Sequence, residues 1–266
     1  MNNRFDLIVI GDSKDGRSLI KTLATTSSQI KIAFISEAFQ NNIRDHLNVE
    51  YLQGKVTFID YYRMLFGCYL DNGDRIYGTH LIFATGEVYE PFMSDNKIVP
   101  NVYNTATQIH EKSKDTQAAI VGNDEEILKI ALKVANKYKH LYICIEGIQL
   151  NCSKALQEKL KSIPSVVILP NTRIKDFLTE DGELKALKLD NYSALTCSVI
   201  YTKTKANGNT AYIPQNLFAR DSQGYLITNK NLESTLVPKC FAIGSCTQKC
   251  TKNMINLLKA EILKDF

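Results

Sequence analysis

The chain has 266 residues, of which 44% are hydrophobic and 23% charged, and its formal net charge is +4 at pH 7. These values are typical of a globular protein with one or two domains and a large core. Lysine and arginine are spread along the chain without a dense run, which argues against a nucleic-acid partner. Without a membrane-length apolar run or a signal-peptide pattern, we expect no membrane partner and a cytoplasmic location. Seven irregularly spaced cysteines agree with that location.

The first expected elements are a strand, a glycine turn, a helix and a second strand. The apolar run FDLIVI at 5–10 predicts the first strand, and GRSLIKTLA at 16–24 has a helical pattern. IKIAFIS at 30–36 predicts the second strand, which ends at Glu37. Short apolar strands separated by a helix predict a βαβ unit with a parallel sheet.

The next stretch predicts an antiparallel meander. Apolar runs at 49–60, 62–70 and 75–86 alternate with turn residues, and Asn72-Gly73 separates the last two runs. An Asn-Gly pair between alternating runs is typical of a tight hairpin. We therefore expect three short strands that lead into a buried strand at HLIFATG, residues 80–86.

A second cycle of the same kind begins near residue 117. Residues 117–147 repeat the order of strand, glycine turn, amphipathic helix and strand. Apolar residues recur at helical spacing in the predicted helix, at Ile127, Ile130, Ala131 and Val134. Further elements are predicted in chain order: a helix at 153–163, strands at 165–170 and 184–190, a strand within 239–250, and a terminal helix at 252–266.

Two segments resemble linkers, at 94–110 and 207–216, and two crossings imply an inserted domain. The predicted fold is α/β, with two Rossmann-like, three-layer dinucleotide-binding domains, each with an antiparallel β-meander. We assign residues 1–108 and 214–266 to a discontinuous first domain, and 109–213 to the domain inserted into it.

The first glycine turn has the features of a dinucleotide-binding fingerprint. Gly11 would allow the tight turn, and Gly16 would allow close packing of helix on strand. Ser13 replaces the middle glycine, but it is small and its hydroxyl can donate to a phosphate. Glu37, at the tip of the second strand, is placed to bind a ribose hydroxyl.

The same turn carries two carboxylates, which a pyrophosphate would not favour. Asp12 occupies a tolerant position, from which its side chain can point to solvent. Asp15 lies nearer the helix N-terminus, where Lys14 and Arg17 offset its charge. We therefore expect this turn to keep a nucleotide.

The order of these motifs resembles thioredoxin-reductase-like flavoproteins of the pyridine nucleotide-disulfide oxidoreductase superfamily. The resemblance rests on VIGDSKDGRSL, GKVTFID, LIFATG, AAIVGNDEEIL and CFAIGS. It implies an FAD domain made from both ends of the chain, an inserted NAD(P)H domain, and a homodimer. It also implies the FAD-binding residues: Gly11, Ser13 and Gly16 at the pyrophosphate, Glu37 at the ribose, Val56 at the adenine, Ala84, Thr85 and Gly86 near the flavin, and Gly244 and Ser245 at the ribityl chain.

The chain departs from the family at its redox centre. No CxxC occurs in the sequence, so a dithiol relay is not expected. Cys246 and Cys250 are candidate catalytic thiols one helical turn apart, and the alternative is that they are small packing residues. Ser245 replaces the closing aspartate of the family, which exchanges a charged hydrogen bond for a weaker neutral one.

The second glycine turn is more altered. Gly122 is kept and Asn123 follows it, but Asp124 stands where the family has glycine. Acidic residues in the first helical turn satisfy the same N–H groups that a pyrophosphate needs. Gly122, Asn123 and Glu146 are the candidate NAD(P) residues, and Glu146, at the tip of the next strand, would favour NAD over NADP.

The residues therefore leave two functions open. One is an FAD-dependent oxidoreductase that passes electrons from NAD(P)H or another donor to an unknown acceptor, which could be a small molecule or a protein. The other is a catalytically inactive relative that serves as a binding or regulatory module. No metal site is expected, because the four histidines (His46, His80, His110 and His140) are scattered.

Overall fold

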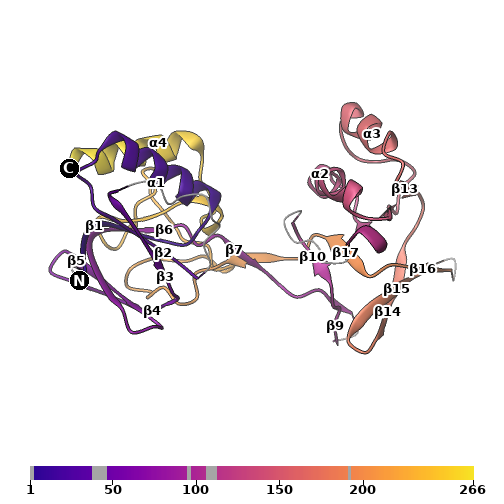
Figure 1. The fold of residues 1–266 in the computed structure, drawn as a ribbon, viewed down its shortest axis with the longest axis horizontal. Coiled ribbons are helices and arrows are strands. Elements are labelled where there is room, and N and C mark those ends of the chain that lie inside the picture. The colour runs from indigo at the N-terminus through magenta and orange to yellow at the C-terminus, as the bar shows by residue number, and fades with distance from the viewer. Residues whose placement is uncertain (1–2, 38–46, 95–96, 106–112, 191–192) are drawn as a thin grey trace. The chain divides into compact units, whose positions relative to one another are not determined.

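A computed structural model describes residues 3–37, 47–94, 97–105, 113–190 and 193–266 (Figure 1). The chain forms two compact units. The first unit comprises Met1–Val88 and Ala206–Phe266, and the second comprises Tyr89–Lys205. The second unit is thus inserted into the first, as the sequence predicts.

The elements of the first unit come from both ends of the chain. They are β1 (Arg4–Ile10), α1 (Lys14–Thr26), β2 (Ile32–Ser36), β3 (Val49–Gln53), β4 (Val56–Tyr62), β5 (Leu65–Leu70), β6 (Arg75–Phe83), β18 (Ala206–Gly208), β19 (Cys240–Ala242), a 3₁₀ turn (Gly244–Cys246) and α4 (Lys252–Lys264). A further strand, β7 (Glu87–Tyr89), spans the boundary of the units and pairs with β18.

The elements of the second unit are contiguous in sequence. They are β8 (Met93–Ser94), β9 (Lys97–Ile98), β10 (Val102–Tyr103), a 3₁₀ turn (Ser113–Asp115), β11 (Gln117–Val121), α2 (Glu125–Val134), a 3₁₀ turn (Ala135–Lys137), β12 (His140–Cys144), α3 (Lys154–Lys161), β13 (Val166–Leu169), β14 (Ile174–Glu180), β15 (Glu183–Leu189), β16 (Ala194–Thr196) and β17 (Val199–Thr202).

In the first unit, the long strand β6 joins a parallel sheet to an antiparallel meander. The sheet order is β3-β2-β1-β6-β5-β4. The first half of β6 pairs antiparallel with β5, from Arg75 to Gly78. Its second half pairs in parallel with β19, from Leu81 to Phe83, while β1 runs parallel along its other edge. Glycine turns at the ends of parallel strands are thereby brought to one edge of the sheet.

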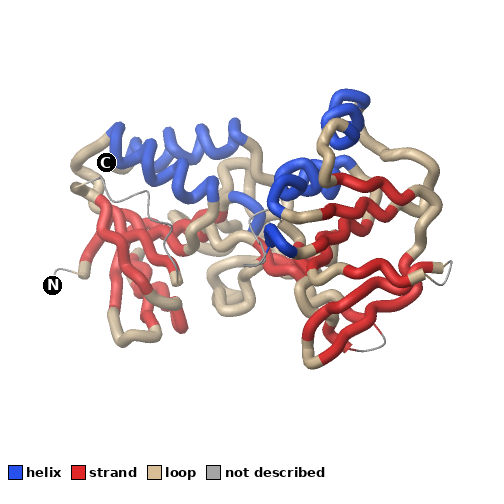
Figure 2. The backbone as a smooth tube through the Cα atoms, turned by 45° about the vertical axis from the view of Figure 1, so that its right-hand side comes forward, coloured by secondary structure: helices blue, strands red, loops and turns tan. Residues whose placement is uncertain are grey.

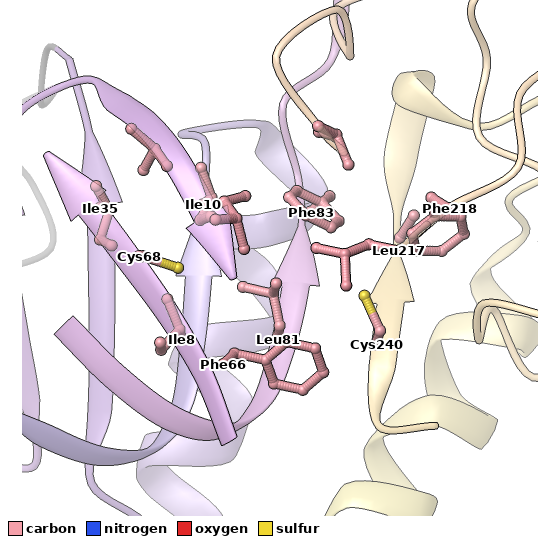
Figure 3. Packing of buried hydrophobic residues seen from close by; sticks show 14 of the residues in the cluster. Ile8, Ile10, Ile35, Phe66, Cys68, Leu81, Phe83, Leu217, Phe218 and Cys240 are labelled. Atoms are coloured by element: carbon pink, nitrogen blue, oxygen red, sulfur yellow. The ribbon is translucent and has the colours of Figure 1, made fainter. Parts of the chain in front are cut away.

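Helices α1 and α4 lie side by side on one face of this sheet (Figures 1 and 2). Their apolar residues, such as Leu19, Leu23 and Leu258, pack on the outward side chains of the strands. The opposite face is buried by the meander and by the loop before β19, with Phe83, Leu217 and Phe218 among the packed residues (Figure 3). Helix, sheet and meander are the three layers expected of a Rossmann-like domain.

The second unit repeats this plan. A parallel sheet of order β10-β17-β11-β12-β13 is covered by α2 and α3, with Ile127, Ala131 and Leu160 buried. A separate antiparallel sheet, β14-β15-β16, packs through Leu184 and Leu187 on the other side. The predicted fold class is confirmed.

Two details differ from the sequence predictions. Residues 49–53 were expected in the meander, but β3 pairs in parallel with β2, from Val49 to Gln53, and so extends the parallel sheet. The units divide at 88/89 and 205/206 rather than at 108/109 and 213/214. The reason is packing: Val99 is buried with the apolar residues of the second unit, whereas Ile213 is buried in the first.

No helix among the described residues is long and apolar enough to cross a membrane.

Candidate functional site

The turn between β1 and α1 requires glycine because of how closely the chain packs on itself. Gly11 has φ +99°, and a Cβ atom there would lie 2.5 Å from the carbonyl oxygen of Ala84. A Cβ atom on Gly16 would lie 2.7 Å from the Cβ of Ala84. The structure therefore supports the turn and packing roles expected of these two glycines. Both roles come from contacts within the protein and do not require a bound ligand.

Ser13 is the N-cap of α1. Its Oγ accepts a hydrogen bond from the Gly16 N–H at 3.1 Å, and its own N–H donates to the Ala84 carbonyl at 3.3 Å. A side chain that satisfies one N–H of the first turn replaces part of what a phosphate would do there. The serine is nonetheless neutral, so the positive end of the helix dipole is not cancelled by a charge.

The two carboxylates of this turn differ in position. Asp12 does not point to solvent as expected: its side chain is only 11% exposed and forms an ion pair with Arg17 at 3.1 Å. Asp15 lies against the loop after β19, since a Cβ atom on Gly244 would be 3.2 Å from Asp15 Oδ2. The charge of Asp12 is thus compensated within the first turn of the helix.

A cavity of about 380 Å³ opens beside this turn at the carboxyl ends of β1 and β2. Four of the predicted FAD-binding residues line it: Gly11, Glu37, Val56 and Thr85. They come from the ends of β1, β2 and β6 and the start of β4, which are far apart in sequence. The cavity is lined by Ile10, Gly11, Asp12, Ile35, Ser36, Glu37, Gly54, Lys55, Val56, Thr85, Asn209, Ala211 and Tyr212.

The other predicted residues of the first unit lie outside this lining, for identifiable reasons. Gly16 and Ala84 are used in packing α1 against β6. Gly244 has φ +75° and lies next to Asp15. Ser245 is exposed, and its Oγ would lie 3.8 Å from a Cβ atom on Gly86. Ser13 lies near Gly244 and Gly86 lies near Ser245, so these four residues gather at the 3₁₀ turn Gly244–Cys246.

Sequence reasoning missed the contribution of the segment after β18. Asn209 donates from Nδ2 to the Thr85 carbonyl at 3.3 Å, and its N–H donates to the Gly86 carbonyl at 3.1 Å. Tyr212 closes the same side of the cavity, and burial raises the pKa of its phenol. This segment has the composition of a linker, and only the Asn-Gly-Asn run at 207–209 indicates that its backbone is held in a turn.

The hydroxyl of Thr85 is a buried polar group that a bound ligand could hydrogen-bond. Its Oγ1 is buried and has no hydrogen-bond partner of ordinary geometry among the described residues, although the Cys246 thiol is near enough to interact with it. A buried hydroxyl without a partner costs free energy, which a bound hydrogen-bonding ligand would recover. The cavity therefore places a polar group, Thr85, beside Glu37 and Val56, the residues expected at the ribose and the adenine of FAD.

The two candidate thiols are not neighbours on a helix. Gly244–Cys246 is a single 3₁₀ turn, and α4 begins only at Lys252, so the expected helical spacing is wrong. Cys246 is fully buried with the meander face of the sheet, whereas Cys250 packs against the helix face. Burial raises the pKa of both thiols, so both are held in the unreactive form.

The second unit has a cavity of its own, of about 490 Å³, at the carboxyl ends of β11 and β12. All three candidate NAD(P) residues of this unit, Gly122, Asn123 and Glu146, line it. Asn123 is already engaged: its Nδ2 donates to the Gln149 carbonyl at 3.0 Å, and its Oδ1 accepts from the Asn151 N–H at 2.8 Å. Glu146 pairs with Arg173 at 3.2 Å.

The N-terminus of α2 is capped by a charged side chain. Asp124 Oδ1 accepts from the N–H groups of Glu126 and Ile127 at 3.0 and 3.1 Å. Burial alone would raise the pKa of Asp124, but the hydrogen bonds from Ile127 and Lys203 lower it below its ordinary value. The acidic cap anticipated from the sequence is thus formed, and it stays ionised at neutral pH.

No group of three or more potential metal ligands occurs in the described part of the chain. His80 is buried and bonded to Asp265 at 2.9 Å, while His140 lies beside the ring of Tyr142. His46 and His110 lie outside the described residues.

Comparison with known proteins assigns the family. The family model described as pyridine nucleotide-disulphide oxidoreductase matches residues 13–260, and the chain belongs to this family of oxidoreductases. Proteins of this family bind FAD and NAD(P)H.

Individual relatives are distant. An NADH dehydrogenase of Bacillus subtilis is 22% identical over 94% of this chain and 55% of its own length. A thioredoxin reductase of Chlamydia pneumoniae is 23% identical over 52% of this chain and 45% of its own length. The chain thus spans about half the length of these curated relatives.

Solved structures share the fold over the whole chain. The T. acidophilum thioredoxin reductase superposes with a TM-score of 0.77 at 12% identity, with 99% of each chain covered. The Lactococcus lactis thioredoxin reductase has a TM-score of 0.75 at 15% identity, with 98% of each chain covered. The fold is therefore that of thioredoxin reductases.

Proposed function

We infer that this chain is an FAD-dependent oxidoreductase that works without a redox-active disulfide. It passes electrons from NAD(P)H or another donor to an acceptor that is a small molecule or a protein. The first unit is the FAD-binding part, and the second is the counterpart of an NAD(P)-binding domain. The family resemblance further suggests a homodimer, and the irregularly spaced cysteines support a cytoplasmic location.

One observation carries this proposal: the first cavity gathers four residues expected at an adenine dinucleotide. The exposed carboxylate of Glu37, at the tip of β2, would accept hydrogen bonds from ribose hydroxyls. Buried Val56 offers an apolar surface to adenine, and Thr85 offers a buried hydroxyl beside the Cys246 thiol. When bound, FAD supplies hydride and single-electron transfer, and the protein orients it and limits its exposure to water.

The chain's cysteines do not support a dithiol relay. No two of them have CxxC spacing, and the pair nearest in sequence lies on opposite faces of the sheet. Burial raises the pKa of both Cys246 and Cys250, which opposes thiolate formation. Any electron transfer would therefore run directly between FAD and the acceptor.

The test is reconstitution with FAD, followed by the visible absorption of the bound flavin. We expect one FAD per chain, and Glu37→Ala should weaken binding about tenfold, the equivalent of one strong hydrogen bond. Glu50→Ala is the matched control, because Glu50 is an exposed acid of β3 outside the cavity. A chain that binds no FAD, or equal loss in both variants, would contradict the assignment.

The alternative function, a binding or regulatory module without turnover, is favoured by one specific feature. Asp124 and Lys203 already occupy the place at α2 where a pyridine nucleotide would set its pyrophosphate. This second function would be favoured if the chain binds FAD but neither NADH nor NADPH bleaches the flavin under anaerobic conditions. The same result should hold for other reductants, none of which would pass electrons through the flavin to an acceptor.

A further inference from the structure

The cavity of the second unit has an apolar wall built from two sheets. Phe92 and Phe177 meet edge to face, with ring centroids 5.0 Å apart. Val121 and Cys144 come from the ends of β11 and β12, and Ile174 begins β14. Aromatic and aliphatic side chains around a cavity of about 490 Å³ are typical of a small-molecule site.

The N-terminus of α2, which follows the lining residues Gly122 and Asn123, is closed to phosphate. In Rossmann-like domains, the N–H groups of the first helical turn bind the pyrophosphate. Here the Asp124 carboxylate accepts from two of them, the N–H groups of Glu126 and Ile127. A phosphate would have to displace a negative charge that is already bound in the same place.

The cations of this region are engaged as well. Lys203 pairs with Asp124 at 3.3 Å and with Glu126. Lys129 pairs with Glu125 at 2.9 Å, and Arg173 pairs with Glu146. Lys203, Lys129 and Arg173 are thus each paired with a carboxylate, and a phosphate that recruited one of them would break an ion pair.

We propose that this cavity binds an uncharged, flat ring compound of about nucleoside size, and that the Asp124–Lys203 pair excludes the phosphates of a pyridine dinucleotide. The ring would lie against Phe92 and Phe177, and Glu146 would accept a hydroxyl hydrogen bond. The residues of the second unit therefore do not fit intact NAD(P)H. This inference rests on the second unit alone and does not depend on FAD binding by the first.

The test uses two fluorescent probes that differ by one phosphate: reduced nicotinamide riboside and its 5′-phosphate. We expect the full chain to bind the riboside at least tenfold more tightly than the phosphate. Equal or tighter binding of the phosphate form would overturn the proposal, as would failure to bind either probe. Flavin absorption reports the first unit separately, so the two proposals can fail independently.

Two variants test where the riboside binds and which residues exclude the phosphate. Phe177→Ala should weaken riboside binding about tenfold, whereas Phe58→Ala, which removes an exposed aromatic ring of the first unit, should not change it. Asp124→Gly should tighten binding of the phosphate about tenfold, because it frees two N–H groups and removes one of the two carboxylates that pair with Lys203.

The matched control for the second variant is Glu158→Gln, which changes the net charge equally at an exposed position of α3 outside the cavity. Glycine is nearly as good an N-cap as aspartate, so Asp124→Gly should still fold, which far-UV circular dichroism would verify. If the Asp124→Gly chain is folded but still binds the phosphate more weakly than the riboside, the Asp124–Lys203 pair is not what excludes the phosphate.

Discussion

The two units solve the same structural problem with different residues. In each, a strand runs into a glycine turn and then a helix, and a polar side chain caps that helix. Ser13 caps α1 with a neutral hydroxyl and takes one N–H group, whereas Asp124 caps α2 with a carboxylate and takes two. Both units therefore keep a side-chain cap at this position, but only the first leaves the helix N-terminus without a capping negative charge.

The glycines separate folding from binding in the same way. Gly11 and Gly16 are required by contacts with Ala84, whereas a Cβ atom on Gly122 would meet Ile127 at 3.4 Å, an ordinary contact. The first turn is thus fixed by tight internal packing. In the second, only the positive φ of Gly122, +134°, demands glycine.

The largest expected effect is on the tighter of the two turns. Gly11→Ala would place a methyl group 2.5 Å from the Ala84 carbonyl oxygen at a positive φ, and should lower the free energy of unfolding by about 3 kcal/mol. Gly73→Ala is the control: its φ is +90°, but its surroundings are open, so only about 1 kcal/mol should be lost. Urea unfolding measures both, and equal losses would show that the close approach is unimportant.

A smaller effect is expected for the thiols of the first unit. Cys246→Ser places a hydroxyl in the apolar core, within reach of the Phe83 and Ile243 carbonyls to which the thiol donates, and should cost about 1 kcal/mol of stability without changing the potential of bound flavin. Cys250→Ser, at a half-buried position, should change stability by no more than about 0.5 kcal/mol. If either variant folds but no longer transfers electrons, that cysteine takes part in electron transfer and the proposal of a direct route from FAD is wrong.

The smallest effect concerns the charge of the second cap. Asp124→Asn keeps a capping oxygen but removes the charge, and should lower stability at pH 7 by about 0.5 kcal/mol, because the carboxylate is half-exposed and screened. The hydrogen bonds lower the pKa of Asp124 in the folded state, so its contribution is present above the unfolded pKa of about 3.9 and is lost as pH falls through the folded pKa.

The difference between wild type and Asp124→Asn should therefore shrink in urea titrations between pH 5 and about pH 2. Glu158→Gln, on an exposed helix face, should show no such convergence. A difference that persists unchanged at low pH would mean that the charge of Asp124 is not what stabilises the turn.

Much of the architecture could be predicted from the sequence, because apolar periodicity and turn residues act locally. The βαβ order, the inserted second unit and the acidic cap of α2 follow from short patterns around Gly11 and Gly122, whereas the cap that Ser13 provides for α1 was not predicted. The boundaries between the two units could not be predicted from local patterns. Val99 is buried in the core of the second unit and Ile213 in that of the first, and both placements depend on contacts distant in sequence.

The site was predictable to a similar degree. Glu37 was found from its place at the tip of the second strand, whereas Val56 and Thr85 were proposed only from the resemblance to thioredoxin-reductase-like flavoproteins. Asn209 and Tyr212 were missed because the segment that contains them has the composition of a linker. It reaches the cavity only because β18, which precedes it, pairs with β7. Asp12 was misjudged because its partner, Arg17, faces it only once the helix has formed.

The most direct test of the account is a crystal structure of the full chain grown with both FAD and NADH. We predict electron density for the FAD adenosine between Glu37 and Val56, with the Asp124 carboxylate still on the N-terminus of α2 and no dinucleotide there. Density for NADH phosphates on α2, or a first cavity without flavin nucleotide, would contradict it.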